Sequence, residues 1–178
     1  MTIQCGSNYI GAVSTESQKT DPHKVDAGPH VEAYRLHIRA AAEDLYQLAA
    51  NPHRHHEIDG SDTVQSRAVG PLALTEGAKF TVQMRKFGLP YRLPLRVTRA
   101  QSPGEDLPGV VEWRQPTGHR WRWEFAPHSD GSTTVTEAFD STWQNPAARA
   151  LLQIAGVPKQ NGHSIRASLR RIRAQFES

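Results

Sequence analysis

Cysteine is almost absent from this sequence. Cys5 is the single cysteine among 178 residues, so the chain can form neither an internal disulfide nor a cysteine-based zinc site. A lack of disulfides fits a reducing compartment. The length suits one domain, or one domain with a tail.

Long apolar runs are also missing. No stretch approaches the ~20 consecutive apolar residues that a membrane-spanning helix needs. The opening segment, MTIQCGSNYIGAVSTESQ, has neither a basic first region nor a continuous apolar stretch, so we expect no secretory signal. The sequence therefore predicts a soluble, cytoplasmic protein without a membrane span.

Charge of one sign does not dominate either. Lys and Arg together number 21 and Asp and Glu 18, which gives a formal net charge of +3. Arginine accounts for 16 of the basic residues and lysine for 5. Arginine can bind phosphate groups bidentately, but no recognised nucleic-acid-binding motif accompanies the charge. We therefore expect solvated arginines on the outer face of a sheet, and no nucleic-acid partner.

Residues 1–29 are polar and show neither a helical nor a strand period. Segments of this kind cannot bury enough apolar surface to hold one conformation. We predict that residues 1–29 form a flexible leader and that residues 30–178 form the folded, ligand-binding domain.

A two-residue period dominates the middle of the chain. It begins at residues 31–40, where Tyr34, Leu36 and Ile38 alternate with charged or polar residues. Two short helical segments follow within 41–58, made of good helix formers and a first-turn proline. The two-residue period then returns in six segments bounded by turn residues, at 61–69, 78–86, 91–99, 109–115, 119–125 and 132–142. This spacing predicts consecutive antiparallel hairpins.

The C-terminal part of the chain has a helical period. Pro146 opens helical sequence that is broken near GVPKQNG, residues 156–162. The last stretch, from residue 163, repeats apolar side chains at helical spacing and has arginines on the opposite face; the apolar positions are Ile165, Leu169, Ile172 and Phe176. This pattern predicts a long amphipathic helix that lies with one face on the sheet.

Three stretches carry the most specific signals: AAAEDLYQLAANPHRHHEIDG at 40–60, EGAKFTV at 76–82, and WEFAPHSDGSTTVTEAFDST at 123–142. Together with the order of elements, they resemble the START-like (SRPBCC) helix-grip proteins, which include polyketide cyclases and pollen-allergen-like proteins. The resemblance covers roughly residues 31 to 177. It implies an α+β fold, in which a curved antiparallel sheet of about seven strands wraps around the long C-terminal helix, with two short helices after the first strand. It also implies a cavity between sheet and helix that takes a polyketide-, lipid- or hormone-like molecule.

The stretch NPHRHHEIDG, residues 51–60, concentrates histidines and carboxylates. At 100° per residue, His53, His56 and Glu57 share one face of a short helix and His55 points away. Three interpretations stay open: a metal site, a histidine that reaches the cavity as an acid/base group, and solvated histidines at the cavity rim. All the candidate ligands sit on one helical turn, with no supporting ligand elsewhere, which argues against a metal. We predict no metal or cofactor, and place His53 and His56 at the cavity mouth.

Glu137 is the second candidate for acid/base chemistry. It shares a strand face with Val135 and Phe139, so it should point inward. A buried carboxyl group must be paired, be hydrogen-bonded or have a raised pKa. Two roles therefore stay open for Glu137: a structural group held by an Arg or Trp donor, or a general acid/base.

The inward-facing side chains give a predicted ligand wall. Aromatic residues at strand spacing usually form core, and in a helix-grip fold the same face is core at one end and cavity lining at the other. The predicted ligand-binding residues are Met84, Tyr91, Leu95, Trp113, Trp121, Trp123, Phe139 and Ile165. We predict binding of a hydrophobic or amphipathic small molecule. The alternative is a polyketide cyclase-, aromatase- or dehydratase-like enzyme that uses His53 or His56 and Glu137 as acid/base groups. The oligomeric state, a homodimer included, stays open.

Overall fold

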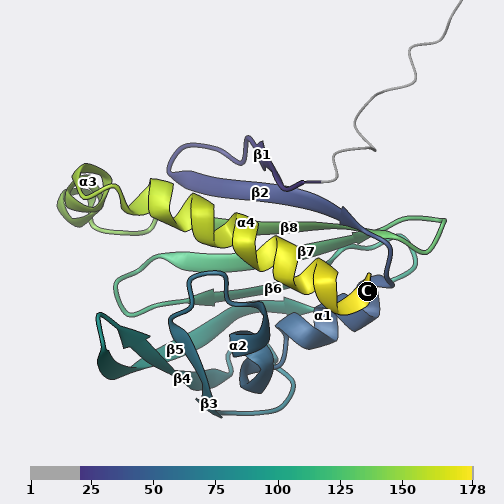
Figure 1. The fold of residues 1–178 in the computed structure, drawn as a ribbon, viewed down its shortest axis with the longest axis horizontal. Coiled ribbons are helices and arrows are strands. Elements are labelled where there is room, and N and C mark those ends of the chain that lie inside the picture. The colour runs from purple at the N-terminus through teal and green to yellow at the C-terminus, as the bar shows by residue number, and fades with distance from the viewer. Residues whose placement is uncertain (1–20, 178) are drawn as a thin grey trace, which may run out of the picture.

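The computed structural model describes residues 21–177, and these form one antiparallel sheet with helices on its concave face. The sheet has eight strands in the order β1-β2-β8-β7-β6-β5-β4-β3. Their bounds are His23–Val25 (β1), Val31–Ile38 (β2), Val64–Val69 (β3), Lys79–Lys86 (β4), Leu89–Gln101 (β5), Gly109–Arg114 (β6), Arg120–Pro127 (β7) and Thr133–Asp140 (β8). The predicted helix-grip architecture is confirmed: the long C-terminal helix crosses the sheet diagonally (Figure 1).

The strands form because apolar and polar side chains alternate along them. In β7, for example, Trp123 and Phe125 are buried while Arg122 and Glu124, which alternate with them, are more accessible. Such alternation matches the pleat of a strand, which points successive side chains to opposite faces. Each predicted two-residue-period segment contributes a strand, and consecutive strands from β3 to β8 pair as hairpin neighbours.

One strand was not predicted. Residues 23–25, which the sequence pattern assigned to the flexible leader, form β1 and pair with residues 33–35 of β2. That part of the leader prediction is wrong, and the sheet has eight strands rather than about seven. The strand was not predicted because three residues are too few to show a two-residue period. It forms because β2 would otherwise present an unpaired edge. The remaining leader prediction, for residues 1–20, lies outside the described residues.

Two short helical segments follow β2, as predicted. They are α1 (Ala42–Ala49), and a 3-10 turn η2 (Pro52–Arg54) that continues into α2 (His55–Ile58). The side chain of Asn51 accepts a hydrogen bond from the His53 backbone N–H and so caps η2. Pro52 fits the first turn because no backbone N–H is needed there.

Two helices end the fold: α3 (Pro146–Ile154) and α4 (Val157–Phe176). Gly156, with φ of +70°, separates them. The helix α4 starts earlier than the sequence suggested, because Pro158 occupies its first turn, where proline is tolerated. Gly162 lies inside α4 at a close approach, since a Cβ there would stand 2.8 Å from a Glu32 carboxylate oxygen. The sequence suggested a helix break at Gly162, but this glycine lies inside α4, where it allows the helix to pack closely on β2.

The core lies between the sheet and the helices, toward the end where α1 sits. The largest fully buried side chains come from β2, α1, β7 and α4, and include Leu36, Ile38, Leu45, Leu48, Phe125, Ile165, Leu169 and Ile172. The apolar face of α4 therefore packs on the sheet as the helical period predicted. At the opposite end, beneath the N-terminal half of α4, the space is not filled by side chains, and a cavity results.

Candidate functional site

A cavity of about 390 Å³ lies between the concave face of the sheet and α4. Three walls enclose it: strands β4 to β8, the segment from α2 to the start of β3, and one side of α4. Its volume is in the range of about 300–1,000 Å³ that is typical of small-molecule sites. The sheet wall places seven of the eight predicted ligand-binding residues in the lining: Met84, Tyr91, Leu95, Trp113, Trp121, Trp123 and Phe139.

The aromatic wall arises from strand register. Trp113 of β6 pairs with Trp121 of β7, and Trp121 pairs with Phe139 of β8. Because directly paired residues point to the same face of the sheet, these three rings form one row across three strands. Trp121 and Phe139 meet edge to face with their centroids 5.3 Å apart. The row gives the cavity a broad apolar surface on which a flat ring can lie.

The α4 wall is small and polar, which was not predicted. Ile165 is fully buried and belongs to the core rather than to the cavity lining. The helix instead presents Val157, Gln160, Asn161, Ser164 and Ser168. The two serines each lie one position before a residue of the apolar stripe. The apolar stripe packs on the sheet, so the face beside it turns toward the open space. Short serine side chains on this face leave the space unfilled.

Glu137 lies in the lining and is almost fully buried. Its Oε2 atom has no hydrogen-bond partner within residues 21–177. Burial, with a smaller contribution from the negative charge of Asp59, raises the pKa of Glu137 well above its ordinary value, while the nearby Ser168 hydroxyl opposes the rise. The burial of Glu137 therefore favours the neutral form of its carboxyl group, which can donate a hydrogen bond.

His55 is the histidine of the 51–60 stretch that lies in the cavity wall. It is buried, and its ring stacks on Trp113 with centroids 4.8 Å apart. His55 Nε2 donates to the Ala49 carbonyl oxygen at 2.9 Å, which leaves Nδ1 as the unprotonated nitrogen. Burial lowers the pKa of His55 to about 4, so the ring is neutral at pH 7.

The helical wheel separated His55 correctly from His53, His56 and Glu57, but the face assigned to the cavity was wrong. His55 lines the cavity, while His53 and His56 lie outside its lining. The wheel gives the relative directions of side chains on a helix but not which face meets the cavity. The ring of His53 bonds the Gly70 carbonyl at 3.1 Å on the exposed side.

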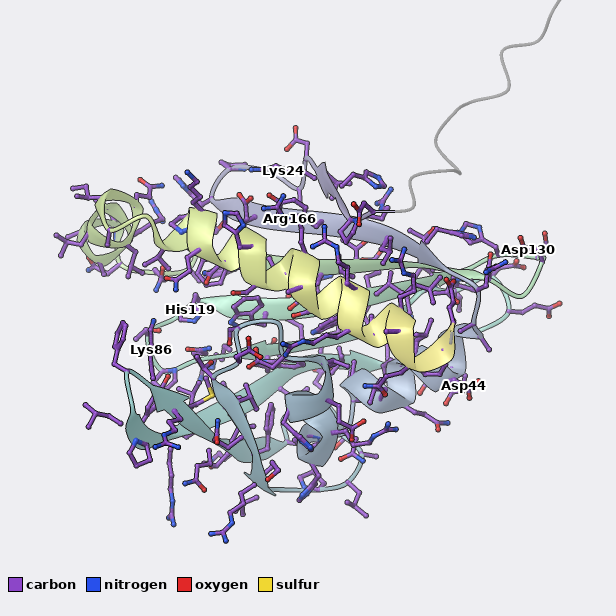
Figure 2. The ribbon with its side chains drawn as sticks, viewed as in Figure 1. Lys24, Asp44, Lys86, His119, Asp130 and Arg166 are labelled. Carbon is purple, nitrogen blue, oxygen red and sulfur yellow. The ribbon has the colours of Figure 1, made fainter. Side chains whose placement is uncertain are left out.

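A second histidine, His119, lines the cavity at the end where α3 lies (Figure 2). Its ring packs against Phe139 with centroids 4.9 Å apart. Burial lowers the pKa of His119 to about 4. The Nδ1 atom contacts the Thr117 hydroxyl at 2.9 Å and the Gln144 amide nitrogen at 3.2 Å. Gln144 itself is buried and also lines the cavity.

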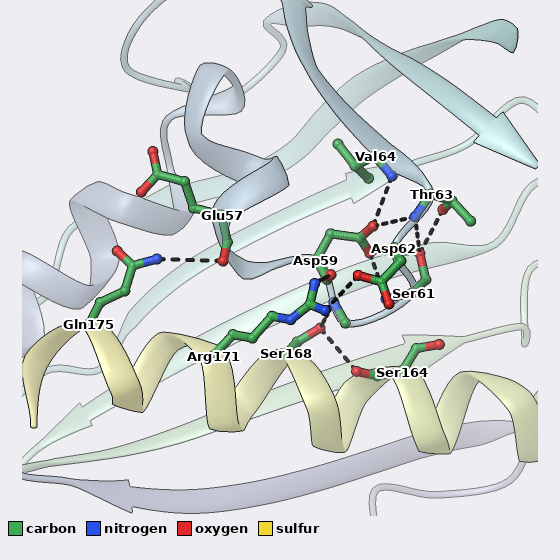
Figure 3. Close-up of polar contacts among 11 residues, drawn as sticks. Glu57, Asp59, Ser61, Asp62, Thr63, Val64, Ser164, Ser168, Arg171 and Gln175 are labelled. Atoms are coloured by element: carbon green, nitrogen blue, oxygen red, sulfur yellow. Dashed lines mark hydrogen bonds and ion pairs between the residues drawn. The ribbon is translucent and has the colours of Figure 1, made fainter. Parts of the chain in front are cut away.

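The segment between α2 and β3 closes the other end of the cavity against α4 (Figure 3). The Asp59 carboxylate accepts from the backbone N–H groups of Ser61, Thr63 and Val64, at 3.0, 2.8 and 2.8 Å. The Arg171 guanidinium donates to the Asp59 carbonyl oxygen and to the Asp62 carboxylate. Gly60 N–H donates to the Ser168 hydroxyl at 3.0 Å. We call residues 59–62 with Ser168 and Arg171 the clasp.

Exposed apolar side chains surround the opposite, open end. The β4–β5 turn exposes Phe87 and Leu89, while α3 exposes Leu151 and Ile154. Lys86, Tyr91 and Leu152 of the same two elements line the cavity. The open end is therefore a mouth between the β4–β5 hairpin and α3.

The described residues show two further features of the chain. Within residues 21–177, no three His, Cys, Asp or Glu side chains come together as a metal-binding group. No helix in this range is both long enough and apolar enough to cross a membrane.

Sequence reasoning missed His55, His119 and Gln144. His119 had a visible signal, since it lies two residues before Trp121 and so has the same strand parity. His55 lies on the helix face opposite His53 and His56, and a helical wheel does not tell which of the two faces meets the cavity. Gln144 lies in the loop between β8 and α3, where no period exists to assign a side to it.

No family model matches the chain. Two curated proteins do: the uncharacterized proteins Rv0088 of Mycobacterium tuberculosis strain H37Rv and MT0096 of strain CDC 1551, which are 41% and 40% identical over 154 residues. The match covers 85% of this chain and 66% of each relative, so the chain spans just under two thirds of their length.

Solved structures match over most of their length at low sequence identity. The KanY protein has a TM-score of 0.61 at 12% identity, covering 85% of this chain and 99% of that one. A START superfamily protein from Mycobacterium smegmatis has a TM-score of 0.58 at 14% identity, covering 84% and 98%. Protein TTHA0849 from Thermus thermophilus has a TM-score of 0.55 at 16% identity, covering 82% and 96%. At such identities the match concerns the fold.

Proposed function

Because the chain has the START-like helix-grip fold, we propose that it binds an uncharged, hydrophobic or amphipathic small molecule of the polyketide or lipid kind. The observation that carries the proposal is the cavity of about 390 Å³, whose sheet wall consists largely of aromatic and aliphatic side chains. Sites of this composition bury most of a drug-sized ligand and orient it with a few polar groups.

The polar groups of the cavity favour an uncharged ligand. The raised pKa of Glu137 favours its neutral form, and the pKa values of about 4 leave the two lining histidines neutral at pH 7. The deep part of the cavity therefore offers hydrogen bonds but no full positive charge to pair with an anion. An anionic ligand would lose its hydration there without compensation, which is costly.

A neutral, environment-sensitive dye tests this proposal. We expect the dye 6-propionyl-2-(dimethylamino)naphthalene to bind at one-to-one stoichiometry, with a blue-shifted emission and quenching of tryptophan fluorescence. Met84→Trp fills the cavity from β4 and should weaken binding about tenfold or more. Gln83→Trp, one position earlier and on the opposite face, is the matched control and should leave binding within about twofold. Absence of dye binding by the wild type, or equal loss in both variants, would exclude the cavity as the site.

A second candidate function is acid/base catalysis, which one observation favours: a buried carboxyl group and two histidines line the same cavity. In this proposal Glu137 donates its proton to a substrate carbonyl oxygen while His55 Nδ1 removes a proton from the adjacent carbon. The C–H bond breaks, its electrons form the enol, and the histidine becomes imidazolium. Such a step begins cyclisation or dehydration of a polyketide-like chain.

Deuterium exchange separates the binder from the enzyme. With 2-acetylnaphthalene in D₂O, an enzyme should speed exchange of the methyl protons, followed by NMR, and Glu137→Gln should lower the rate by about 10²-fold or more. A pure binder should hold the ketone without accelerating exchange. Glu137→Gln keeps the shape of the side chain, so binding of the ketone serves as the control for an intact cavity.

A further inference from the structure

Gln144 and His119 form a polar pair at the side of the cavity nearest the mouth. Gln144 is 4% exposed, although it lies in a loop. The loop is held to the β6–β7 turn, because a Cβ on Gly118 would stand 3.0 Å from the Trp143 carbonyl oxygen. Gly118 has φ of +95°, a conformation that favours glycine. The close approach of two backbones thus fixes where both side chains start.

The hydrogen bonds determine how the Gln144 amide is turned. Its nitrogen lies 3.5 Å from the Thr117 carbonyl oxygen and 3.2 Å from His119 Nδ1. A carbonyl oxygen can only accept, so the NH₂ group must face it, and the amide oxygen faces the other way. Both amide hydrogens are therefore used within the protein, whereas Oε1 is buried and has no partner within residues 21–177.

The same bonds determine the tautomer of His119. The Gln144 NH₂ group can only donate, and the Thr117 hydroxyl at 2.9 Å can donate as well, so His119 Nδ1 is placed to accept. The proton of the neutral ring then resides on Nε2, which has no hydrogen-bond partner among the described residues. The cavity wall consequently offers an N–H donor, from His119, next to an unsatisfied carbonyl acceptor, from Gln144.

We propose that His119 and Gln144 are a specificity-determining pair, which binds an uncharged ligand group with a hydrogen-bond acceptor and a donor side by side. A primary carboxamide or an enolised β-dicarbonyl group has this chemistry. The acceptor of the ligand receives the His119 Nε2 proton, and its donor bonds Gln144 Oε1. The rest of the ligand lies on the Trp121 and Phe139 rings. This inference rests on the proposed binding function and adds the chemical class of the ligand's polar group.

An unsatisfied buried acceptor is costly, and the bond that satisfies it is correspondingly favourable. Three probes of one size differ only in this group: 2-naphthamide has acceptor and donor, 2-acetylnaphthalene has the acceptor alone, and 2-naphthoate is an anion. Calorimetric titration of the whole protein should show 2-naphthamide binding about tenfold more tightly than 2-acetylnaphthalene. The naphthoate should bind more weakly than the amide, because its carboxylate can only accept hydrogen bonds and has no donor for the Gln144 carbonyl oxygen.

Gln144→Met and His119→Phe keep the size of each side chain and remove its polar group. Each should reduce the preference for the amide to about twofold or less, while 2-acetylnaphthalene still binds to Gln144→Met as to the wild type. Gln153→Met, the same change on the exposed face of α3, should keep the preference. Equal affinity of the wild type for amide and ketone would contradict the proposed role of His119 and Gln144. A preference for the amide that survives in both variants would contradict it as well. Failure of all three probes to bind would instead overturn the proposed function. Thermal midpoints identify a variant that fails to fold, and the affinity ratio in the wild type still decides the proposal.

Discussion

The two ends of the cavity are built differently. At the clasp, chain and helix meet through backbone contacts: Gly60 lies directly on α4, and Arg171 donates to the Asp59 carbonyl oxygen. At the mouth, the β4–β5 turn and α3 expose apolar side chains, and Phe87 is 92% exposed. The clasp residues donate to and accept from one another (Figure 3). The mouth instead leaves apolar surface exposed.

This difference suggests how stability and recognition are divided along the cavity. Contacts that involve backbone atoms at a fixed distance tolerate little change. Exposed side chains at a mouth contribute little to folding and are free to serve ligand entry. Substitutions should therefore affect mainly stability at the clasp and mainly binding at the mouth.

The largest effect is expected for Gly60→Ala. A Cβ at residue 60 would overlap the Ser164 carbonyl oxygen and the Ser168 backbone nitrogen, and neither can move without shifting α4. We expect a loss of about 3 kcal/mol or more in the free energy of unfolding, measured by urea denaturation. Gly104→Ala is the control, because its Cβ would make an ordinary 3.4 Å contact with Leu107. A Gly60→Ala protein as stable as the control would show that the clasp does not hold the loop tightly.

The clasp also illustrates what the sequence alone could predict. The strand parity from Phe80 to Phe139 follows from a two-residue period, so seven side chains of the sheet wall were predicted to face the cavity. Val82, Leu93 and His119, which line the same wall, were not among the predicted ligand-binding residues. The clasp depends on Gly60 meeting residues more than a hundred positions later, and no local pattern encodes that distance. The prediction that Ile165 lines the cavity was wrong for a related reason. The helical period identifies the face of α4 that packs on the sheet, but not which neighbouring face meets the open space.

A pH-dependent effect is expected for His55 at the clasp end of the cavity. Its folded pKa of about 4 lies below the ordinary value of 6.5, so the unfolded chain binds a proton that the folded protein excludes. The stabilisation is complete above pH 6.5 and is lost as the pH falls toward 4, by up to about 3 kcal/mol. His55→Gln keeps a donor for the Ala49 carbonyl but does not titrate, so its unfolding free energy should fall less over this range.

His163 is the matched control, since it is an exposed histidine on α4. His163→Gln should lose stability between pH 6.5 and 4 as the wild type does. If His55→Gln and His163→Gln show the same acid dependence in urea denaturation, the burial of a neutral imidazole against Trp113 is not what the protein loses on acidification.

The smallest effect, of opposite sign, is expected at the mouth. Phe87 and Gly88 have φ of +51° and +80°, the conformation of a two-residue hairpin turn in which asparagine followed by glycine is preferred. Phenylalanine is strained there and its ring is exposed, so Phe87→Asn should raise the free energy of unfolding by about 0.5 kcal/mol. Ile154→Asn, at an exposed helix position with ordinary backbone geometry, should bring no gain in the free energy of unfolding.

If the mouth serves ligand entry, Phe87→Asn should also slow the association of the naphthalene dye in stopped-flow measurements, while the stability of the protein rises. A loss of stability on Phe87→Asn would mean that the ring packs on the protein, and that the mouth is built like the clasp after all.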